Sequence, residues 1–214
     1  MGTESLTVLG YSPPTLTMIL DALESKSWFP CVTVVNNLGA LHSCEYENPR
    51  FRISFASELP KSNLCCLGVY KSSTKMSVRK AFPVDCESLA HASAQISSTA
   101  SLGQGCLVNS MVSVAAHAKI GDFVSINRNA SVGHHTEIGN FSTINPGVDI
   151  AGFVKIGSGT TLGIGCCVVD GVTIGSNTTI GAGSVVTKDI PDGVVAYGSP
   201  CKVVRKLECA HEIL

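Results

Sequence analysis

Aliphatic residues recur at every sixth position, without interruption, from Ile96 to Val186. All sixteen of these positions hold isoleucine, leucine or valine. The residue two places before each of them is never larger than valine, and the residue directly after is glycine in eight cases and asparagine in three. The repeated aliphatics are Ile96, Leu102, Val108, Val114, Ile120, Ile126, Val132, Ile138, Ile144, Ile150, Ile156, Leu162, Val168, Ile174, Ile180 and Val186.

A period of six is incompatible with one face of an α-helix, which repeats every 3.6 residues. It fits short strands, because residues i and i−2 of a strand face the same side and a corner then resets the pattern. Glycine and asparagine tolerate positive φ, so the residues that follow the aliphatics suit sharp corners. The repeat therefore predicts a parallel β-helix whose coils bury their aliphatic residues against each other.

Residues 1–85 lack this period and have the pattern of a small α/β domain. Apolar runs predict strands at residues 6–10, 31–35 and 64–70. Helical spacing predicts one helix at residues 13–24, which begins with two prolines, and another at residues 73–82. The order strand, helix, strand, loop, strand, helix predicts a Rossmann-like βαβ unit with a parallel sheet.

Ligands of parallel sheets bind beyond the carboxyl ends of the strands. In this chain those ends are Gly10-Tyr11-Ser12 and Asn36-Asn37, which are the candidate substrate-binding residues. The first loop is not Gly-x-Gly-x-x-Gly, because Gly10 is followed by Tyr-Ser-Pro-Pro, so a dinucleotide site has little support. An equal alternative is that Gly10 only ends a strand.

These patterns divide the chain into an α/β domain at residues 1–85, a β-helix at residues 86–191 and a C-terminal tail at residues 192–214. The period of six stops before Pro191, which cannot donate a hydrogen bond to a strand ladder. The tail contains a possible short helix that carries Lys202, Arg205 and Lys206 on or near one side.

Composition adds expectations about partners and location. Charged residues make up 14% of the chain and the net charge is −1, which gives no electrostatic reason to expect nucleic acid or an anionic membrane as a partner. The low charge suggests that other subunits cover part of the surface. No apolar run reaches eighteen residues, the chain start lacks a signal-peptide pattern, and the ten cysteines lack metal-finger spacing. We therefore expect a cytoplasmic protein with reduced cysteines.

The strongest candidate for chemistry is His134-His135, in one corner of the predicted coil. If three hexads form one coil, residues eighteen apart stack at about 4.8 Å. His135 then lies over His117, and His134 lies between Ala116 and Gly152. Histidine accepts a proton near neutral pH, and a corner beside small residues is accessible to a substrate. The alternative is a pair of solvent-facing histidines without a catalytic role.

The same stacking places Asn145 over Asn127 over Asn109. We interpret this ladder as hydrogen bonding that stabilises the corner, although Asn127 could face a ligand. A zinc site needs at least three converging protein ligands, whereas only His117 and His135 stack, so no metal is expected. The chain has no Gly-x-Ser-x-Gly motif and no P-loop, so serine hydrolysis and kinase chemistry have no support.

Hexads such as Ile120-Gly-Asp-Phe-Val-Ser125 and Ile138-Gly-Asn-Phe-Ser-Thr143 resemble those of the hexapeptide acyltransferases of the left-handed β-helix class. The stretch from Val132-Gly-His134-His135 to Ile-Asn-Pro-Gly147 resembles, more narrowly, the nucleotide-sugar N-acetyltransferases of bacterial glycan synthesis. Their relatives include the bacillosamine-pathway enzyme and the sialic-acid O-acetyltransferases. The resemblance covers nearly the whole chain and includes Gly-Ser-Pro-Cys-Lys202, which is similar to a terminal Gly-x-Pro-Ala-Lys.

The resemblance implies a homotrimer that binds acetyl-coenzyme A along the β-helix between subunits. It also implies that the N-terminal domain holds a UDP-, dTDP- or GDP-linked amino sugar. Carried over to this chain, it makes His134 the general base, with His135 beside it, and makes Asn127 a residue that faces the sugar. The implied coenzyme-binding residues are Thr143, Gly152, Gly163, Ile164 and Lys202.

The chain departs from this pattern at three places. His135 stands where the family usually has an acidic residue that orients the base, and Thr143 stands where a second histidine often contacts the thioester. The glycine-rich first loop is Gly10-Tyr-Ser-Pro-Pro, and the acidic pair after the second strand is Asn36-Asn37. The expected activity is acetyl transfer to a sugar amine. Acetylation of a sugar hydroxyl and a non-catalytic β-helix scaffold are the alternatives.

Overall fold

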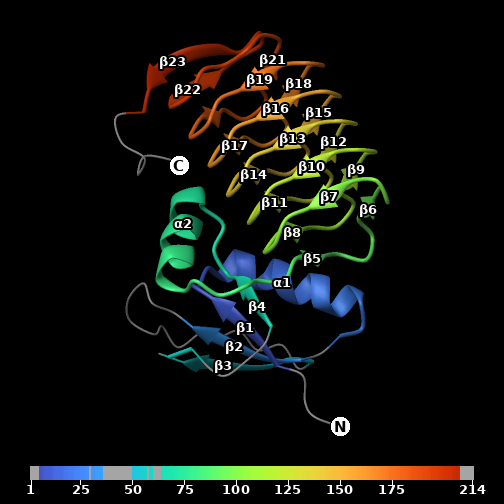
Figure 1. Ribbon diagram of the computed structural model, residues 1–214, viewed down its shortest axis with the longest axis vertical. Coiled ribbons are helices and arrows are strands. Elements are labelled where there is room, and N and C mark those ends of the chain that lie inside the picture. The colour runs from blue at the N-terminus through green and yellow to red at the C-terminus, as the bar shows by residue number, and fades with distance from the viewer. Residues whose placement is uncertain (1–4, 29, 36–49, 57, 60–63, 208–214) are drawn as a thin grey trace.

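The structure is a computed structural model and describes residues 5–28, 30–35, 50–56, 58–59 and 64–207. An α/β unit lies at one end of a long parallel β-solenoid (Figure 1). Asn36-Asn37 lies outside the described residues. Within the described ranges, no helix is long and apolar enough to cross a membrane.

The α/β unit has a four-stranded, fully parallel sheet in the order β3-β2-β1-β4. Strand β3 is the element that the search for apolar runs misses, because it has no such run: its apolar residues alternate with polar ones at the edge of the sheet. The other three strands and both helices lie where the sequence predicts them. The elements are β1 (Ser5–Leu9), α1 (Pro13–Ser25), β2 (Cys31–Val35), β3 (Arg52–Ala56), β4 (Cys65–Leu67) and α2 (Ser72–Ala81).

The solenoid has three faces, each a stack of short strands. Face 1 contains β5 (Leu89–Ala90), β8 (Leu107–Val108), β11 (Ser125–Ile126), β14 (Thr143–Ile144), β17 (Thr161–Leu162), β20 (Thr179–Ile180), β22 (Val194–Tyr197) and β23 (Lys202–Lys206). Face 2 contains β6 (Gln95–Ile96), β9 (Ser113–Val114), β12 (Ser131–Val132), β15 (Asp149–Ile150), β18 (Cys167–Val168) and β21 (Val185–Val186). Face 3 contains β7 (Ser101–Leu102), β10 (Lys119–Ile120), β13 (Glu137–Ile138), β16 (Lys155–Ile156) and β19 (Thr173–Ile174).

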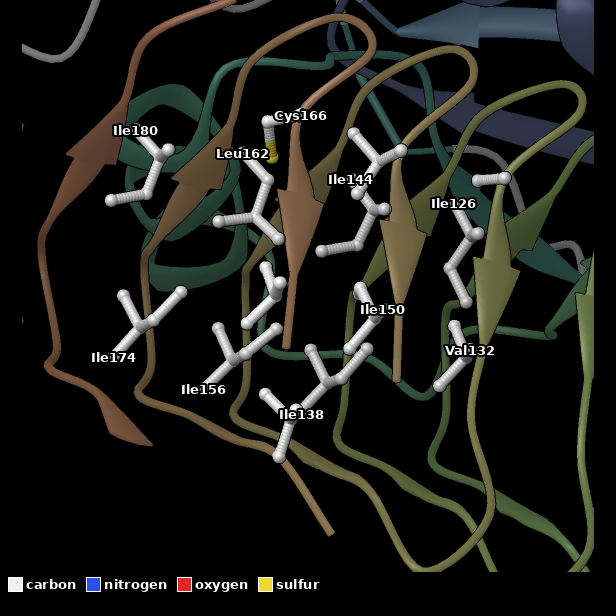
Figure 2. Close-up of a cluster of buried hydrophobic side chains, with 14 of the residues drawn as sticks. Ile126, Val132, Ile138, Ile144, Ile150, Ile156, Leu162, Cys166, Ile174 and Ile180 are labelled. Atoms are coloured by element: carbon white, nitrogen blue, oxygen red, sulfur yellow. The ribbon is translucent and has the colours of Figure 1, made fainter. Parts of the chain in front are cut away.

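Stacked residues of the solenoid are eighteen positions apart. Ile120 pairs with Ile138, which pairs with Ile156, so the predicted coil of three hexads is confirmed. The repeated aliphatic side chains point inward from all three faces and form one continuous core (Figure 2). From Val108 to Val186, each repeated aliphatic residue is at most 4% exposed.

Glycine has a different role in the corners from the predicted one. In most corners the residue with positive φ is the third after the aliphatic, as in His117 (60°), His135 (59°) and Phe153 (57°). The glycine directly after the aliphatic lies where the next coil comes close: a Cβ on Gly133 would be 2.3 Å from the carbonyl carbon of Ala151. These glycines are therefore required by the spacing of the coils and not by a left-handed backbone.

The C-terminal end of the solenoid is closed on all three faces by residues 190–206. On face 1, β22 pairs with β20 and β23 then pairs antiparallel with β22. On face 2, the N–H of Cys201 donates to the carbonyl of Val185 (2.8 Å), and on face 3 the N–H of Ile190 donates to the carbonyl of Thr173 (2.9 Å).

The predicted short helix in the tail is wrong where the structure describes it, because Lys202, Arg205 and Lys206 belong to strand β23. The segment Lys-Val-Val-Arg-Lys has two adjacent β-branched residues, which favour a strand. Strand β22 also offers an edge of backbone donors and acceptors that pairing satisfies.

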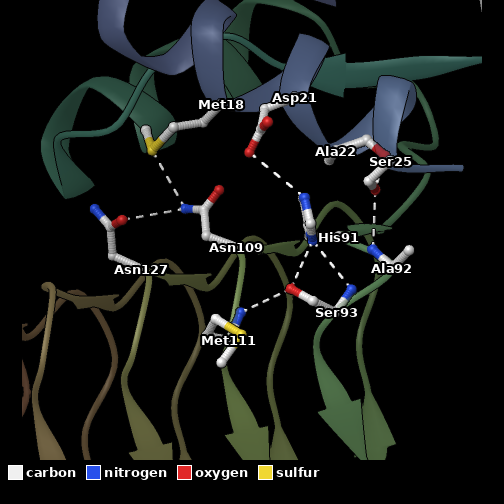
Figure 3. Close-up of polar contacts among 10 residues, drawn as sticks. All are labelled: Met18, Asp21, Ala22, Ser25, His91, Ala92, Ser93, Asn109, Met111 and Asn127. Carbon is white, nitrogen blue, oxygen red and sulfur yellow. Dashed lines mark hydrogen bonds and ion pairs between the residues drawn. The ribbon is translucent and has the colours of Figure 1, made fainter.

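Helix α1 lies between the parallel sheet and the first coils of the solenoid (Figure 1). Its apolar side packs in one cluster with Leu107. Polar contacts complete the docking: Ser25 Oγ accepts a hydrogen bond from the N–H of Ala92 (2.9 Å), and Asp21 Oδ2 lies 3.6 Å from Nε2 of His91 (Figure 3). The α/β unit is thereby held against face 1.

Helix α2 places a lysine inside its contact with the solenoid. Lys75 is 1% exposed, and its Nζ donates to the carbonyls of Phe123 and Ser142 and to Oγ1 of Thr143, each at 3.1 Å. These three acceptors match the three N–H groups of an ammonium. Burial lowers the pKa of Lys75 to about 7, because the charged form loses its hydration. The folded chain therefore gains or loses this proton near neutral pH.

This proton should make the stability of the fold depend on pH. Between the folded pKa of about 7 and the unfolded value of 10.5, the unfolded chain holds the proton and the folded chain has released it. The free energy of unfolding should therefore rise with pH in this window, by up to about 1.4 kcal/mol per pH unit from this group. Lys75→Met, which keeps the apolar volume, should lose this slope in urea unfolding measured from pH 7 to 9.

The matched control is Lys80→Met, which changes an exposed lysine of the same helix. It should keep the pH slope of the unaltered chain. Equal slopes in the unaltered chain and in Lys75→Met would show that the buried ammonium keeps its ordinary proton affinity.

Candidate active site

The two predicted catalytic histidines lie in the corner between faces 2 and 3, which we call the histidine corner (residues 133–136 and the residues stacked on them). His134, Gly152 and Asp170 occupy the same position in three successive coils. A Cβ on Gly152 would lie 2.8 Å from Nε2 of His134 and 2.9 Å from Oδ1 of Asp170. The side chains of His134 and Asp170 therefore both lie next to Gly152, His134 from the preceding coil and Asp170 from the following coil. Because Gly152 has no side chain, there is space for both.

His135 belongs to an aromatic stack in the same corner. Its ring lies 4.8 Å from that of His117 and 4.9 Å from that of Phe153, measured between centroids, so the predicted stacking of the two histidines is confirmed. Nδ1 of His135 lies 3.2 Å from Nδ1 of His134, and one of these nitrogens must carry the proton of that hydrogen bond. The contact uses Nδ1 of His134 and leaves its Nε2 beside Gly152.

The backbone N–H of Gly152 has no acceptor among the described residues. In the neighbouring corner between faces 3 and 1, side chains pair some of the equivalent N–H groups: that of Asp122 donates to Oδ1 of Asn140 (2.9 Å), and that of Gln104 donates to Oδ1 of Asp122 (3.0 Å). Within the histidine corner, the equivalent N–H groups of His134 and Asp170 also have no acceptor among the described residues. A free backbone donor beside an imidazole nitrogen is suited to acyl transfer, because one group stabilises an oxyanion while the other takes a proton.

A cavity of about 390 Å³ lies between the α/β unit and face 1. Tyr11 and Ser12, which follow β1, line it together with Tyr70 and Lys71, which follow β4, and Asn145 of the solenoid. The structure thus brings two of the predicted substrate-binding residues to a cavity at the carboxyl ends of parallel strands, where ligands of such sheets bind.

Both helices begin at this cavity, α1 after Ser12 and α2 after Lys71. Neither helix has a side-chain cap or an acidic residue in its first turn, so their dipoles and the Lys71 ammonium favour an anion there. Pro13 and Pro14 lack N–H groups, so α2 offers more free donors than α1. Gly10 is not part of the lining; its positive φ (76°) ends β1.

Tyr70 connects the cavity to the ladder of asparagines. Its hydroxyl donates to Oδ1 of Asn145 (3.1 Å) and accepts from Nδ2 of Asn127 (3.1 Å). Oδ1 of Asn127 also accepts from Nδ2 of Asn109 (3.4 Å; Figure 3). Burial raises the pKa of Tyr70, so the hydroxyl remains a donor at neutral pH. Asn127 is 8% exposed and lines a smaller cavity of about 200 Å³ beside α1.

Sequence analysis missed Tyr70 and Lys71 as cavity residues. Their signal is positional, because Tyr70 ends the third apolar run and Lys71 follows it, at the carboxyl end of a parallel strand. The hydrogen bonds of Tyr70 with the asparagine ladder have no counterpart in the hydrophobic pattern, since the two segments are far apart in sequence.

The residues implied for coenzyme binding do not lie together within one chain. Gly152 is in the histidine corner, whereas Gly163 and Ile164 follow β17 in the corner between faces 1 and 2, where Ile164 is 59% exposed. Thr143 is 2% exposed at the contact with α2, and Lys202 begins β23. Face 2 separates Gly152 from the corner that holds Gly163 and Ile164. The coenzyme-binding roles of all these residues stay predictions.

The histidine corner and the 390 Å³ cavity also lie on different sides of the solenoid. The cavity opens on face 1, and His134 lies between faces 2 and 3. Over the described part of the chain, no group of three or more His, Cys, Asp or Glu residues could hold a metal ion.

Comparison with known proteins shows similarity to acyltransferases of this architecture. Residues 153–188 match the family model described as bacterial transferase hexapeptide (six repeats). A search of curated proteins found no match. The structure resembles PerB from Caulobacter crescentus, solved with CoA and GDP-perosamine, with a TM-score of 0.81, 27% identity and coverage of 94% of this chain and 97% of that one.

The acetyltransferase domain of PglB from Neisseria gonorrhoeae FA1090, solved with acetyl coenzyme A, has a TM-score of 0.83 and 25% identity, and the match covers 95% of this chain and 100% of that one. WeeI from Acinetobacter baumannii AYE shares the fold, with a TM-score of 0.74, 19% identity and coverage of 94% and 100%. The resemblance to hexapeptide-repeat nucleotide-sugar N-acetyltransferases that the sequence predicts is therefore confirmed.

Proposed function

We propose that this protein transfers the acetyl group of acetyl-CoA to the amine of a nucleoside-diphosphate amino sugar in bacterial glycan biosynthesis. The observation that carries the proposal is the position of Nε2 of His134 in an exposed corner beside Gly152, whose backbone N–H has no acceptor among the described residues. The similarity to PerB and to the PglB domain, which were solved with CoA or acetyl-CoA, supports the same chemistry for this chain.

His134 acts as the general base of this reaction. An ammonium cannot attack a thioester, so its nitrogen must lose a proton before the C–N bond forms, and Nε2 of His134 receives it. His135 orients the base through the contact between the two Nδ1 atoms. The Gly152 N–H stabilises the oxyanion of the tetrahedral intermediate.

The 390 Å³ cavity binds the nucleoside diphosphate, whether UDP, dTDP or GDP. The starts of α1 and α2 and the Lys71 ammonium surround it, and this combination favours phosphate groups. The hydroxyl of Tyr70 and the side chain of Asn145 supply hydrogen-bonding groups at the solenoid side. The α/β unit is thus a Rossmann-like sugar-nucleotide domain.

The working enzyme is a homotrimer of left-handed β-helices whose active sites lie between neighbouring subunits. The support is geometric: the sugar-nucleotide cavity and His134 lie on different sides of one solenoid, so a neighbouring subunit must bring them together. Acetyl-CoA then lies between two solenoids. It can contact Gly152 of one chain and Gly163 and Ile164 of the neighbouring chain, although these residues lie in separate corners of each chain. The cytoplasmic location expected from the sequence stays a prediction.

Two alternative functions are acetylation of a sugar hydroxyl and a non-catalytic scaffold, and experiments distinguish each from acetylation of an amine. Acetylation of a sugar hydroxyl needs the same base and the same free N–H, so the acceptor must be identified directly. A non-catalytic scaffold would keep the solenoid but would bind neither acetyl-CoA nor a sugar nucleotide. Acetyl-CoA and sugar nucleotides should raise the melting temperature of an enzyme that binds them and should leave that of a scaffold unchanged.

The role of His134 is tested by His134→Ala and His134→Asn. Loss of the base should lower turnover by about 10²- to 10⁴-fold, the usual contribution of general-base catalysis, because the amine then loses its proton only to water. The measurement is single-turnover acetyl transfer to a panel of UDP-, dTDP- and GDP-linked amino sugars. Acetyl-CoA binding, followed by calorimetry, should stay close to that of the unaltered protein.

Turnover near the original value in both variants would remove His134 from the mechanism. Absence of transfer to every amino sugar, combined with the absence of any thermal shift, would favour the scaffold.

A mixed-subunit experiment tests the position of the active site between chains. His134→Ala removes the base and Lys71→Ala weakens the sugar-nucleotide cavity, so each variant alone should be poorly active. If one subunit supplies the base and its neighbour the cavity, random co-assembly of equal amounts should restore about a quarter of the sites. Activity that stays at the level of the separate variants would place both groups in one chain.

A further inference from the structure

We propose that Asp170 selects an amine as the acyl acceptor by binding the ammonium form of the sugar next to His134. This inference rests on the proposed function and adds the group that distinguishes an amine from a hydroxyl. Asp170 lies thirty-six residues, or two coils, beyond His134. The family resemblance assigns no role to this position.

The side chain of Asp170 behaves differently from its counterparts in the neighbouring corner. Asp122 and Asn140 hold the same position in their hexads, and the side chain of each accepts a backbone N–H from the preceding coil. Asp170 is exposed and has no hydrogen bond or ion pair among the described residues. Its Oδ1 instead lies 2.9 Å from the point where a Cβ on Gly152 would be.

Two side-chain groups therefore lie beside the space at Gly152, the imidazole Nε2 of His134 and the carboxylate of Asp170, and the Gly152 N–H has no acceptor among the described residues. An unpaired carboxylate attracts a cation, and an ammonium has three N–H donors. One donor can bind Oδ1 of Asp170 while another points to Nε2 of His134. A sugar hydroxyl is uncharged and has one donor, so it cannot donate to both groups at once and has no charge for the carboxylate to attract.

The proton and electron balance follows from this arrangement. The ammonium gives one proton to His134, which passes it to solvent, and the amine lone pair then forms the C–N bond to the thioester carbon. The carbonyl becomes an oxyanion on the Gly152 N–H, and its collapse breaks the C–S bond. The second proton leaves the nitrogen through His134 and reaches the thiolate, so the products are the amide, CoASH and one released proton.

The test compares a sugar nucleotide in two forms. The first is the amino sugar that the unaltered protein binds best among UDP-, dTDP- and GDP-linked amino sugars. The second is its counterpart with a hydroxyl in place of the amine. Asp170→Asn should raise Kd and KM for the amino sugar by about tenfold, the size of one charge-assisted hydrogen bond. Kd for the hydroxyl counterpart should not change. Asp170→Glu, which restores the charge, should recover part of the loss.

The control variant is Asp122→Asn, which removes a carboxylate from the same hexad position in the other corner and keeps an amide oxygen to accept the backbone N–H. It should bind both sugars as the unaltered protein does. Equal effects of Asp170→Asn on the two sugars, or no effect on either, would overturn the assignment of Asp170.

The two binding measurements separate this inference from the proposed function. If the unaltered protein binds the amino sugar but transfers no acetyl group, the proposed function fails and the difference in Kd still decides the role of Asp170. If the unaltered protein does not bind any of the amino sugars, both proposals are overturned.

Discussion

The close stacking of the coils is the constraint on which the rest of this structure depends. Backbone hydrogen bonds hold each coil about 4.8 Å from the next, so every side chain has fixed neighbours eighteen residues away in both directions. A small residue is needed wherever a bulky side chain of the adjacent coil occupies the space of its Cβ, as Gly152 is needed beside the ring of His134. The same rule that builds the core therefore also brings together an imidazole, a carboxylate and a free N–H on the surface.

The α/β unit depends on the solenoid for part of its own interior. Helix α1 packs against the first coils, and α2 inserts the Lys75 ammonium among acceptors of face 1. This contact fixes the ends of β1 and β4 over the solenoid, and the 390 Å³ cavity lies between the α/β unit and face 1. Binding at the cavity and stability of the contact are thus linked through the same residues, since Thr143 both accepts from Lys75 and lines the cavity.

Periodic features of this protein could be read from its sequence, and features made by contacts between distant segments could not. The six-residue repeat is enough to place Ile138 over Ile120 and His135 over His117, because stacking needs only counting. The hydrogen bonds of Tyr70 and the burial of Lys75 depend on how α2 docks on face 1, which no local pattern encodes. The tail sequence alone does not reveal strand β23, because its pairing depends on the free edge of β22.

The closed C-terminal end of the solenoid limits how these molecules can associate. A stack of parallel strands exposes an unpaired edge at its end, which is a template for adding another chain. Here residues 190–206 cover that edge on all three faces, and the last strand carries Lys202, Arg205 and Lys206. End-to-end growth into a fibre is thereby blocked at this end by backbone pairing and by positive charge. The long sides of the solenoid remain available to other chains, so lateral assemblies with a limited number of subunits are favoured over open polymers.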